Sequence, residues 1–167
     1  MAAPYSGKAI ANAFLNAGVR DDRPVDHMKL QKLIYFTHGY HLALADGLPL
    51  LDELFEAWTF GPVLPSVYHE FKGFGAQPIT RLATEYKPSY RRAMPVPPPA
   101  DDPITEKIVD FVWRHYSQLP SIQLSNLTHK TTGPWYNTLR EEGATKYRNK
   151  DIDNRLIHEY FSKLVNA

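Results

Sequence analysis

The stretch MKLQKLIYFTHGYHLAL, residues 28–44, decides how the rest of this sequence is interpreted. It has the length of a helix of several turns, and its apolar side chains spread over nearly every face. A helix that is apolar nearly all round is usually buried by several neighbours, so we expect this one to form the centre of the fold. Lys29 and Lys32 are expected to mark its one solvent-exposed edge.

The composition limits the class of protein. A chain of 167 residues is long enough to bury a core, and we expect residues 1–167 to form a single domain. The formal net charge of +1 gives no global reason to expect nucleic acid or a membrane surface as partner. The absence of cysteine excludes disulfides and a cysteine nucleophile, and it is compatible with a reducing cytoplasm. We see no signal peptide or membrane span and therefore predict a cytoplasmic protein.

Upstream of the central helix, Ser6 is a plausible N-cap for a helix that we expect Gly18 to end. Downstream, the aromatic and alternating segment LFEAWTF predicts a short strand that ends at Gly61-Pro62. A further helix is predicted from Pro65 to about Gly73. Residues 76–92 could supply a second strand to form a small β-hairpin.

The segment MPVPPPADDP, residues 94–103, carries five prolines and predicts an extended connector between two lobes. The second lobe reads as helices, the first of which opens at Pro103. Its expected buried stripe consists of Ile104, Ile108, Phe111, Val112 and His115. Two shorter helices and a C-terminal helix follow, and Gly143 is expected to end the one that opens at Pro134. The predicted fold class is α+β and predominantly α-helical, with about six helices around the buried central helix.

Two histidines of the central helix, His38 and His41, are three residues apart and could reach one metal ion from one face. A third ligand could come from His27, Glu53, His69 or Glu70, but none of them stands in a recognised metal spacing. A histidine on an aromatic helix is more often a hydrogen-bonded core residue, so we predict no metal site and no cofactor.

Thr128 and His129 precede Trp135 in the segment NLTHKTTGPWY, and a hydroxyl close to a histidine can be part of a nucleophilic site. There is no nucleophile elbow and no obvious carboxylate to orient the histidine. We therefore favour a helix end capped by Thr128 and His129, with Trp135 packed beneath. The sequence makes no strong case for an enzyme.

Residues 71–92 interleave rings with cations, a mixture that suits either single-stranded nucleic acid or a protein interface. The near-neutral charge of the chain favours a protein interface or a solvated loop. We select Tyr86, Tyr90, Arg91 and Arg92 as candidate partner-binding residues, because Tyr and Arg are enriched at interface hot spots.

Three blocks of the sequence resemble the SocA-like antitoxin, or Panacea, domain family, which also includes phage-associated proteins of the GepA type. The blocks are LQKLIYFTHGYHLAL (30–44), FEAWTFGPVLPSVYHEFK (55–72) and LSNLTHKTTGPWY (124–136). Their order and spacing fit the family from about Ser6 to Trp135. The family's motif residues correspond here to Leu30, Lys32, Leu33, Tyr35, His38, Trp58, Gly61, Pro62, Val63, Tyr68, Thr128, His129, Pro134 and Trp135. We interpret them as mainly structural.

The resemblance implies that this chain is the antitoxin of a type II toxin–antitoxin pair. Such a protein neutralises a cognate toxin by direct binding, without catalysis. One family member resembles an adaptor that delivers its toxin to a AAA+ protease of the ClpXP type, and the motifs leave open whether this chain does so. The alternative is a winged-helix-like DNA-binding regulator of its own operon. The near-neutral charge argues against nucleic acid as the main partner.

Overall fold

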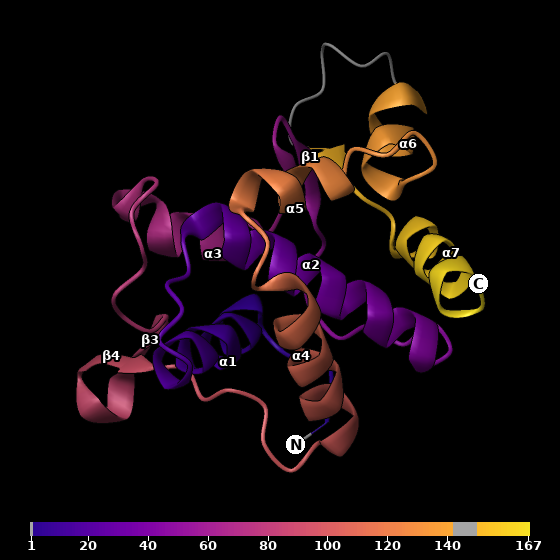
Figure 1. Cartoon of the computed structure of the whole chain (residues 1–167). Coiled ribbons are helices and arrows are strands. Elements are labelled where there is room, and N and C mark those ends of the chain that lie inside the picture. The colour runs from indigo at the N-terminus through magenta and orange to yellow at the C-terminus, as the bar shows by residue number, and fades with distance from the viewer. Residues whose placement is uncertain (1, 142–149) are drawn as a thin grey trace.

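The computed structural model describes residues 2–141 and 150–167. These residues contain seven α-helices and two small antiparallel sheets, which confirms the predicted α+β, predominantly helical class (Figure 1). The helices are α1 (Gly7–Arg20), α2 (His27–Leu44), α3 (Pro65–Phe71), α4 (Pro103–Tyr116), α5 (Ser121–Leu127), α6 (Pro134–Glu141) and α7 (Asn154–Val165). The end predicted for α6, at Gly143, lies outside the described residues.

The central helix is α2, and it contacts α1, α3, α4, α5 and α7. Figure 1 shows it crossing the molecule, with α4 and α5 passing over it and α7 beside its C-terminal half. Asp26 caps the helix by accepting a hydrogen bond of 2.9 Å from the backbone N–H of Lys29. Fourteen of its 18 residues are buried, as the apolar pattern on all sides predicts.

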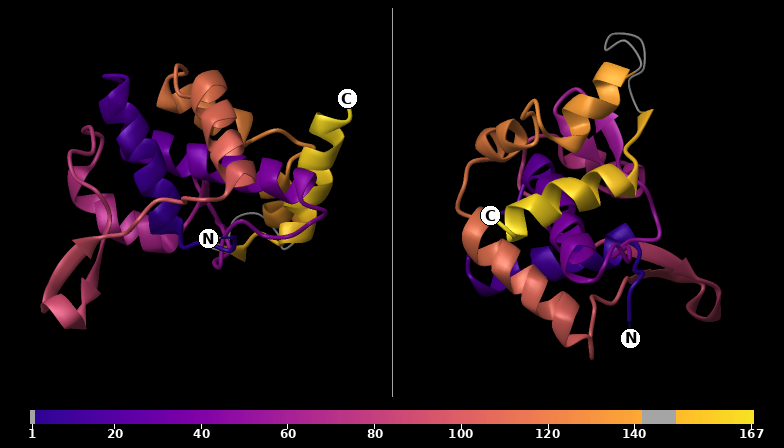
Figure 2. Two further views of the ribbon diagram at one scale, coloured as in Figure 1. Left: turned by 90° about the horizontal axis from the view of Figure 1, so that it is seen from below. Right: turned by 90° about the vertical axis from the view of Figure 1, so that its right-hand side faces the viewer.

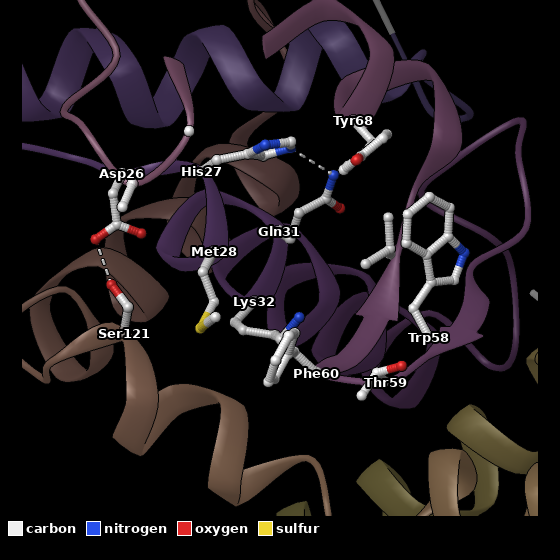
Figure 3. A pocket seen from close by; sticks show the side chains of 13 residues that line it. Asp26, His27, Met28, Gln31, Lys32, Trp58, Thr59, Phe60, Tyr68 and Ser121 are labelled. Atoms are coloured by element: carbon white, nitrogen blue, oxygen red, sulfur yellow. Dashed lines mark hydrogen bonds between the residues drawn. The ribbon is translucent and has the colours of Figure 1, made fainter. Parts of the chain in front are cut away.

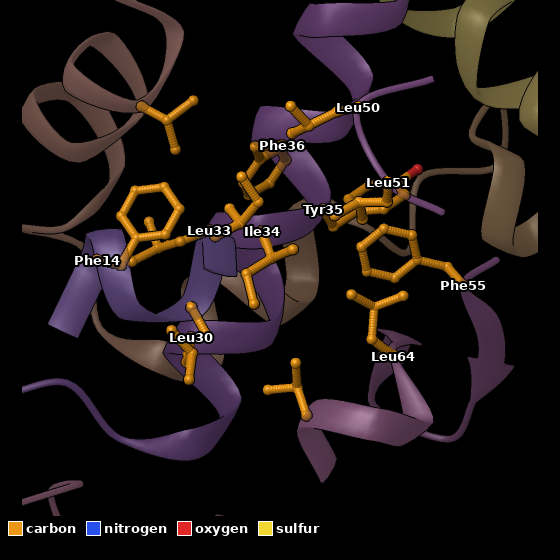
Figure 4. Close-up of a cluster of buried hydrophobic side chains, with 14 of the residues drawn as sticks. Phe14, Leu30, Leu33, Ile34, Tyr35, Phe36, Leu50, Leu51, Phe55 and Leu64 are labelled. Carbon is orange, nitrogen blue, oxygen red and sulfur yellow. The ribbon is translucent and has the colours of Figure 1, made fainter. Parts of the chain in front are cut away.

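The hydrophobic core is arranged around α2 (Figure 4). Phe14 of α1 covers one side of the helix, and Phe55, Leu50 and Leu51 from the following loop cover another. The Tyr35 ring meets Phe55 edge to face, with 5.3 Å between centroids, and meets Phe161 of α7 at 5.7 Å. Elements far apart in the sequence therefore share one core through the side chains of α2.

The prediction that Lys29 and Lys32 form an exposed edge was wrong, because both side chains are buried. The Lys29 ammonium donates to the Ser117 carbonyl at 2.7 Å, and Lys32 donates to the Pro62 carbonyl at 3.0 Å. Chain segments remote from α2 thus supply backbone acceptors, which local sequence cannot reveal.

The strands differ from the prediction in their partners. Strand β1 (Glu56–Trp58) is confirmed, but Gly61-Pro62 begins its partner β2 (Gly61–Val63) and does not end the sheet. Trp58 pairs with Gly61, so residues 59 and 60 form a two-residue turn. The other edge of β1 pairs with β5 (Lys150–Asp151).

The predicted second strand belongs to a separate hairpin. Strand β3 (Thr84–Lys87) pairs with β4 (Arg92–Pro95), and the short 3-10 helix η2 (Pro88–Tyr90) joins them. Both views in Figure 2 show this hairpin projecting from the helices. A second 3-10 turn, η1 (Lys72–Phe74), extends α3.

Two helices differ from the prediction in detail. Helix α1 continues past Gly18 to Arg20, because Gly18 is a packing position whose missing side chain admits the Arg23 carbonyl and Val25. In α4 the buried face includes Ile108 and Val112 as predicted. The prediction was wrong for Ile104 and Phe111, which are 59% and 40% exposed, and for His115, which is also exposed.

Helix α4 is oriented by polar contacts at both ends. Its cap residue Asp102 accepts a hydrogen bond of 2.8 Å from the Tyr5 hydroxyl, and Trp113 donates from its indole nitrogen to Asp21 at 2.7 Å. The side chain of Trp113 is buried in the core, whereas that of Phe111 is not. None of the helices within the described ranges has the length and hydropathy that a membrane span requires.

Candidate functional site

A pocket of about 710 Å³ opens between the N-terminal half of α2, the β1–β2 turn, α3 and the start of α5 (Figure 3). Its walls are mainly apolar and come from Met28, Trp58, Phe60, Val63 and Tyr68. The Trp58 and Tyr68 rings are in contact at 4.6 Å between centroids, and the His27 ring stacks on Tyr68 at 5.3 Å. This size and lining are typical of small-molecule sites.

Gln31 fixes the polar side of the pocket. Its amide oxygen accepts from the Leu64 N–H at 2.8 Å and its amide nitrogen donates to the Leu64 carbonyl at 3.2 Å, which sets the orientation of the amide. The same nitrogen lies 3.3 Å from Nε2 of His27, so Nε2 accepts and the proton of the neutral ring is on Nδ1. Burial and the nearby Lys32 lower the pKa of His27, which also favours the neutral ring.

Lys32 lies against the β1–β2 turn with only 1% of its surface exposed. Burial lowers the pKa of its ammonium from 10.5 to about 7, and no carboxylate in the described part of the chain forms an ion pair with it. A side chain at Gly61 would overlap the Lys32 Cε and the Thr128 hydroxyl, and Gly61 has a φ of +113°. Glycine is therefore needed at position 61 for both conformation and space.

At the other end of the pocket, Asp26 accepts from the Ser121 hydroxyl while its second oxygen caps α2 (Figure 3). The two charged groups of the pocket are thus held by different elements. Asp26 caps the first turn of α2. Within the described residues, the Lys32 ammonium has one hydrogen bond, to the Pro62 carbonyl.

The β3–β4 hairpin is anchored at its base by the buried Asn12 of α1. The Asn12 amide donates to the carbonyls of Ala83 and Val96 at 2.9 and 2.8 Å, and its oxygen accepts from the Ala83 N–H at 2.7 Å. Glu70 adds a hydrogen bond to the Thr84 N–H at 3.0 Å. A two-stranded hairpin is marginal on its own, so these contacts hold it in place.

All four candidate partner-binding residues lie on this hairpin and are exposed. Tyr86 and Tyr90 are each 65% exposed, and Arg91 and Arg92 follow at the start of β4. Arg91 has a left-handed backbone with a φ of +50°. Arg81 of the same segment is structural instead, since it pairs with Glu70 at 2.7 Å and lies over the buried Phe71 ring.

The two histidines considered as metal ligands are each engaged in a hydrogen bond with another part of the chain. His38 donates from Nε2 to the side-chain oxygen of Asn154 at 2.8 Å, and His41 donates from Nδ1 to the Leu48 carbonyl at 2.9 Å. Glu53 instead accepts from the Gly7 N–H at 2.7 Å. Across residues 2–141 and 150–167, no group of three metal-binding side chains could hold an ion.

The segment around Thr128 joins α5 to the β1–β2 turn. The Thr128 hydroxyl donates to the Ser125 carbonyl at 2.6 Å, and His129 packs on Trp135 with 4.0 Å between ring centroids. The Trp135 indole donates to the Trp58 carbonyl at 2.7 Å. This geometry agrees with the interpretation of a helix end with Trp135 packed beneath.

The family motif residues therefore gather in three places. Leu30, Leu33, Tyr35 and His38 lie in the core of α2, and Thr128, His129, Pro134 and Trp135 join α5 and α6 to β1. The remaining six, Lys32, Trp58, Gly61, Pro62, Val63 and Tyr68, line the pocket or contact Lys32. Sequence reasoning treated this last set as structural and did not predict the pocket, because its walls come from separate elements.

Comparison with known proteins identifies the family. The family model described as "Antitoxin SocA-like, Panacea domain" matches residues 30–136. The chain is 37% identical over 128 residues to Antitoxin SocA of Caulobacter vibrioides (strain NA1000 / CB15N), an alignment that covers 77% of this chain and 67% of that protein. The comparison with solved structures gave no match. The chain belongs to the SocA-like antitoxin, or Panacea, domain family.

Proposed function

We propose that this protein is the antitoxin of a type II toxin–antitoxin pair and that it neutralises a cognate toxin by direct binding. The observation that carries the proposal is the 37% identity to Antitoxin SocA over most of the chain. Such a role requires a binding surface and no catalysis, so we infer that the protein is not an enzyme. A cytoplasmic location remains a prediction.

The hairpin supports a specific interface. Tyr86, Tyr90, Arg91 and Arg92 project from the molecule, and these residue types are enriched at hot spots. The exposed cations outnumber the single exposed carboxylate of the hairpin, Glu85, which favours an acidic partner surface. A standard interface buries ~1,600 Å² in total, so the hairpin would supply the anchors of a larger contact.

The packing of α2 against helices on both sides of the proline-rich connector supports our interpretation of residues 1–167 as a single domain. A rigid body that holds the base of the hairpin through Asn12 would present its tip with little ordering cost on binding.

Co-expression with each adjacent reading frame tests the function. We expect one neighbour to inhibit growth, and this chain to restore growth and co-purify with it. Restored growth without a recovered complex, together with a shorter toxin half-life that depends on a AAA+ protease, would identify delivery to the protease as the mechanism. If neither neighbour is toxic, the proposed function is wrong, and steeply salt-dependent DNA binding would favour the regulator.

The interface is tested with hairpin variants. We expect Tyr90→Ala and Arg91→Gly each to weaken toxin binding at least tenfold in titration calorimetry, because each removes one exposed anchor. Glycine is used at position 91 because it adopts the left-handed backbone without strain. Both variants should keep the thermal midpoint, since neither side chain is buried.

The matched controls are Leu48→Ala and Arg114→Ala, which remove an exposed apolar and an exposed cationic side chain elsewhere on the surface. They should bind the toxin as the unmodified protein does. Equal affinity in the hairpin variants and the controls would remove the hairpin from the interface.

A further inference from the structure

The pocket beside α2 holds a charge that the rest of the described chain does not balance. Lys32 is 1% exposed, and the only hydrogen bond recorded for its ammonium among the described residues is to the Pro62 carbonyl. A buried ammonium can donate three hydrogen bonds and is costly to bury without an anion. A chain that only needed an apolar helix surface at this position could use methionine or leucine.

The walls around Lys32 determine what could supply the anion. Trp58, Tyr68, Met28, Val63 and Phe60 present rings and apolar side chains, so an occupant must carry an apolar body. A single cation is balanced by a single negative charge. A phosphate would need further cations or clustered N–H donors, and Lys32 is the only Lys or Arg among the pocket's lining residues.

The polar groups of the pocket agree with an acid as the occupant. The Gln31 amide is hydrogen-bonded to Leu64, and the neutral His27 ring keeps its proton on Nδ1. Neither side chain therefore supplies a negative charge to Lys32. Asp26 is the one carboxylate of the lining, and it lies at the far end, held by Ser121 and the first turn of α2.

We propose that this pocket binds a small organic carboxylate, whose apolar body packs between the aromatic walls and whose carboxylate pairs with the Lys32 ammonium. The volume of about 710 Å³ suits a ligand of two rings or a comparable alkyl chain. The site is distinct from the β3–β4 hairpin, so the proposal does not depend on the antitoxin interface.

Titration calorimetry with biphenyl-4-acetate as the probe and the neutral biphenyl-4-acetamide as its match tests the proposal. At pH 6.5 we expect the unmodified protein to bind the acid at least tenfold more tightly than the amide. Lys32→Met should lose that preference while still binding the amide, because it removes the charge and keeps the apolar wall.

Lys29→Met is the matched control. Lys29 is a buried lysine one turn earlier on the same helix, but its ammonium donates to Ser117 and it does not line the pocket. This variant should keep the preference for the acid. Met28→Trp, which narrows the pocket and leaves both lysines in place, should weaken binding of both probes and is the alternative variant if Lys32→Met does not fold.

Three results would overturn the proposal. The acid and the amide could bind equally, Lys29→Met could lose the preference as completely as Lys32→Met, or Met28→Trp could bind unchanged. Binding of a peptide with a carboxyl-terminal phenylalanine, in the absence of binding by the free acid, would assign the pocket to a chain terminus and not to a small molecule.

Discussion

At the scale of single residues, Lys32 shows how a cation is tolerated inside an apolar fold. Its ammonium is buried between α2 and β2, and its pKa falls to about 7 because the charged form is desolvated. His27 and His129, which also face this region, have pKa values lowered by burial and by Lys32 itself. The two histidines are therefore stable in their neutral forms within the fold, whereas Lys32 carries its charge below about pH 7.

The lowered pKa of Lys32 predicts how stability depends on pH. Between pH 7 and its unfolded pKa of about 10.4, the unfolded chain binds a proton at Lys32 that the folded chain has lost. Stability should therefore rise with pH in this window, by ~1–2 kcal/mol between pH 7 and 8.5. The two histidines titrate below this window and do not contribute to the rise.

Urea unfolding at pH 7.0 and 8.5 measures this effect. Lys32→Met should remove most of the increase. Lys29→Met should leave most of it, because Asp26 partly offsets the lowering of the Lys29 pKa. A slope that is equal in Lys32→Met and the unmodified protein would show that Lys32 titrates normally.

At the scale of secondary-structure elements, the contact of α2 with α7 depends on Gly39. A methyl group at this position would overlap the Phe161 ring, which is fully buried. Glycine inside a helix costs roughly 1 kcal/mol relative to alanine. Its presence in α2 is explained by the close approach of the α7 ring.

Gly39→Ala should therefore destabilise the protein although it improves helix propensity. Overpacking a well-packed core costs typically ~1–3 kcal/mol, and the Phe161 ring is fully buried. We expect a net loss of ~1–2 kcal/mol and a thermal midpoint lower by about 2–8 °C.

Gly73→Ala is the control, since a side chain there meets no atom within 4 Å. It should change stability by less than ~0.5 kcal/mol. An unchanged midpoint in Gly39→Ala would mean that α7 shifts away from α2 at little cost.

At the scale of the whole molecule, the fold extends beyond the segment that the family model matches. That segment, residues 30–136, includes most of α2 but excludes α1 and α7. Both helices bury side chains against α2, with Phe14 from α1 and Phe161 from α7 among the fully buried residues.

A fragment of residues 30–136 should therefore fail to fold cooperatively. Without α1 and α7, two faces of α2 would expose apolar side chains to water. This exposure costs a free energy of ~25 cal/mol for each Å² of apolar surface. We expect broad thermal unfolding by circular dichroism and binding of a hydrophobic dye, in contrast to a single transition for residues 1–167. A sharp cooperative transition in the fragment would show that the matched segment is an independent folding unit.

Local pattern in the sequence was enough to determine most elements. The position and burial of α2, the cap at Ser6, and the helix starts at Pro65, Pro103 and Pro134 were predicted from residue types and spacing. Caps and helical periodicity act within one or two turns of the chain, so a single sequence contains their signal. The motif blocks also carried enough information to identify the family.

Tertiary structure alone decided where charges and strands are placed. Lys29 and Lys32 can be buried because the carbonyls of Ser117 and Pro62, which are remote in sequence, accept hydrogen bonds from their ammonium groups. The partners of β1 and the separation of the β3–β4 hairpin depend on pairings that no local pattern specifies. The pocket likewise exists only where α2, α3, α5 and the β1–β2 turn meet. The sequence alone determined which segments become helices, and long-range packing determined which polar groups of these helices are buried in the protein interior.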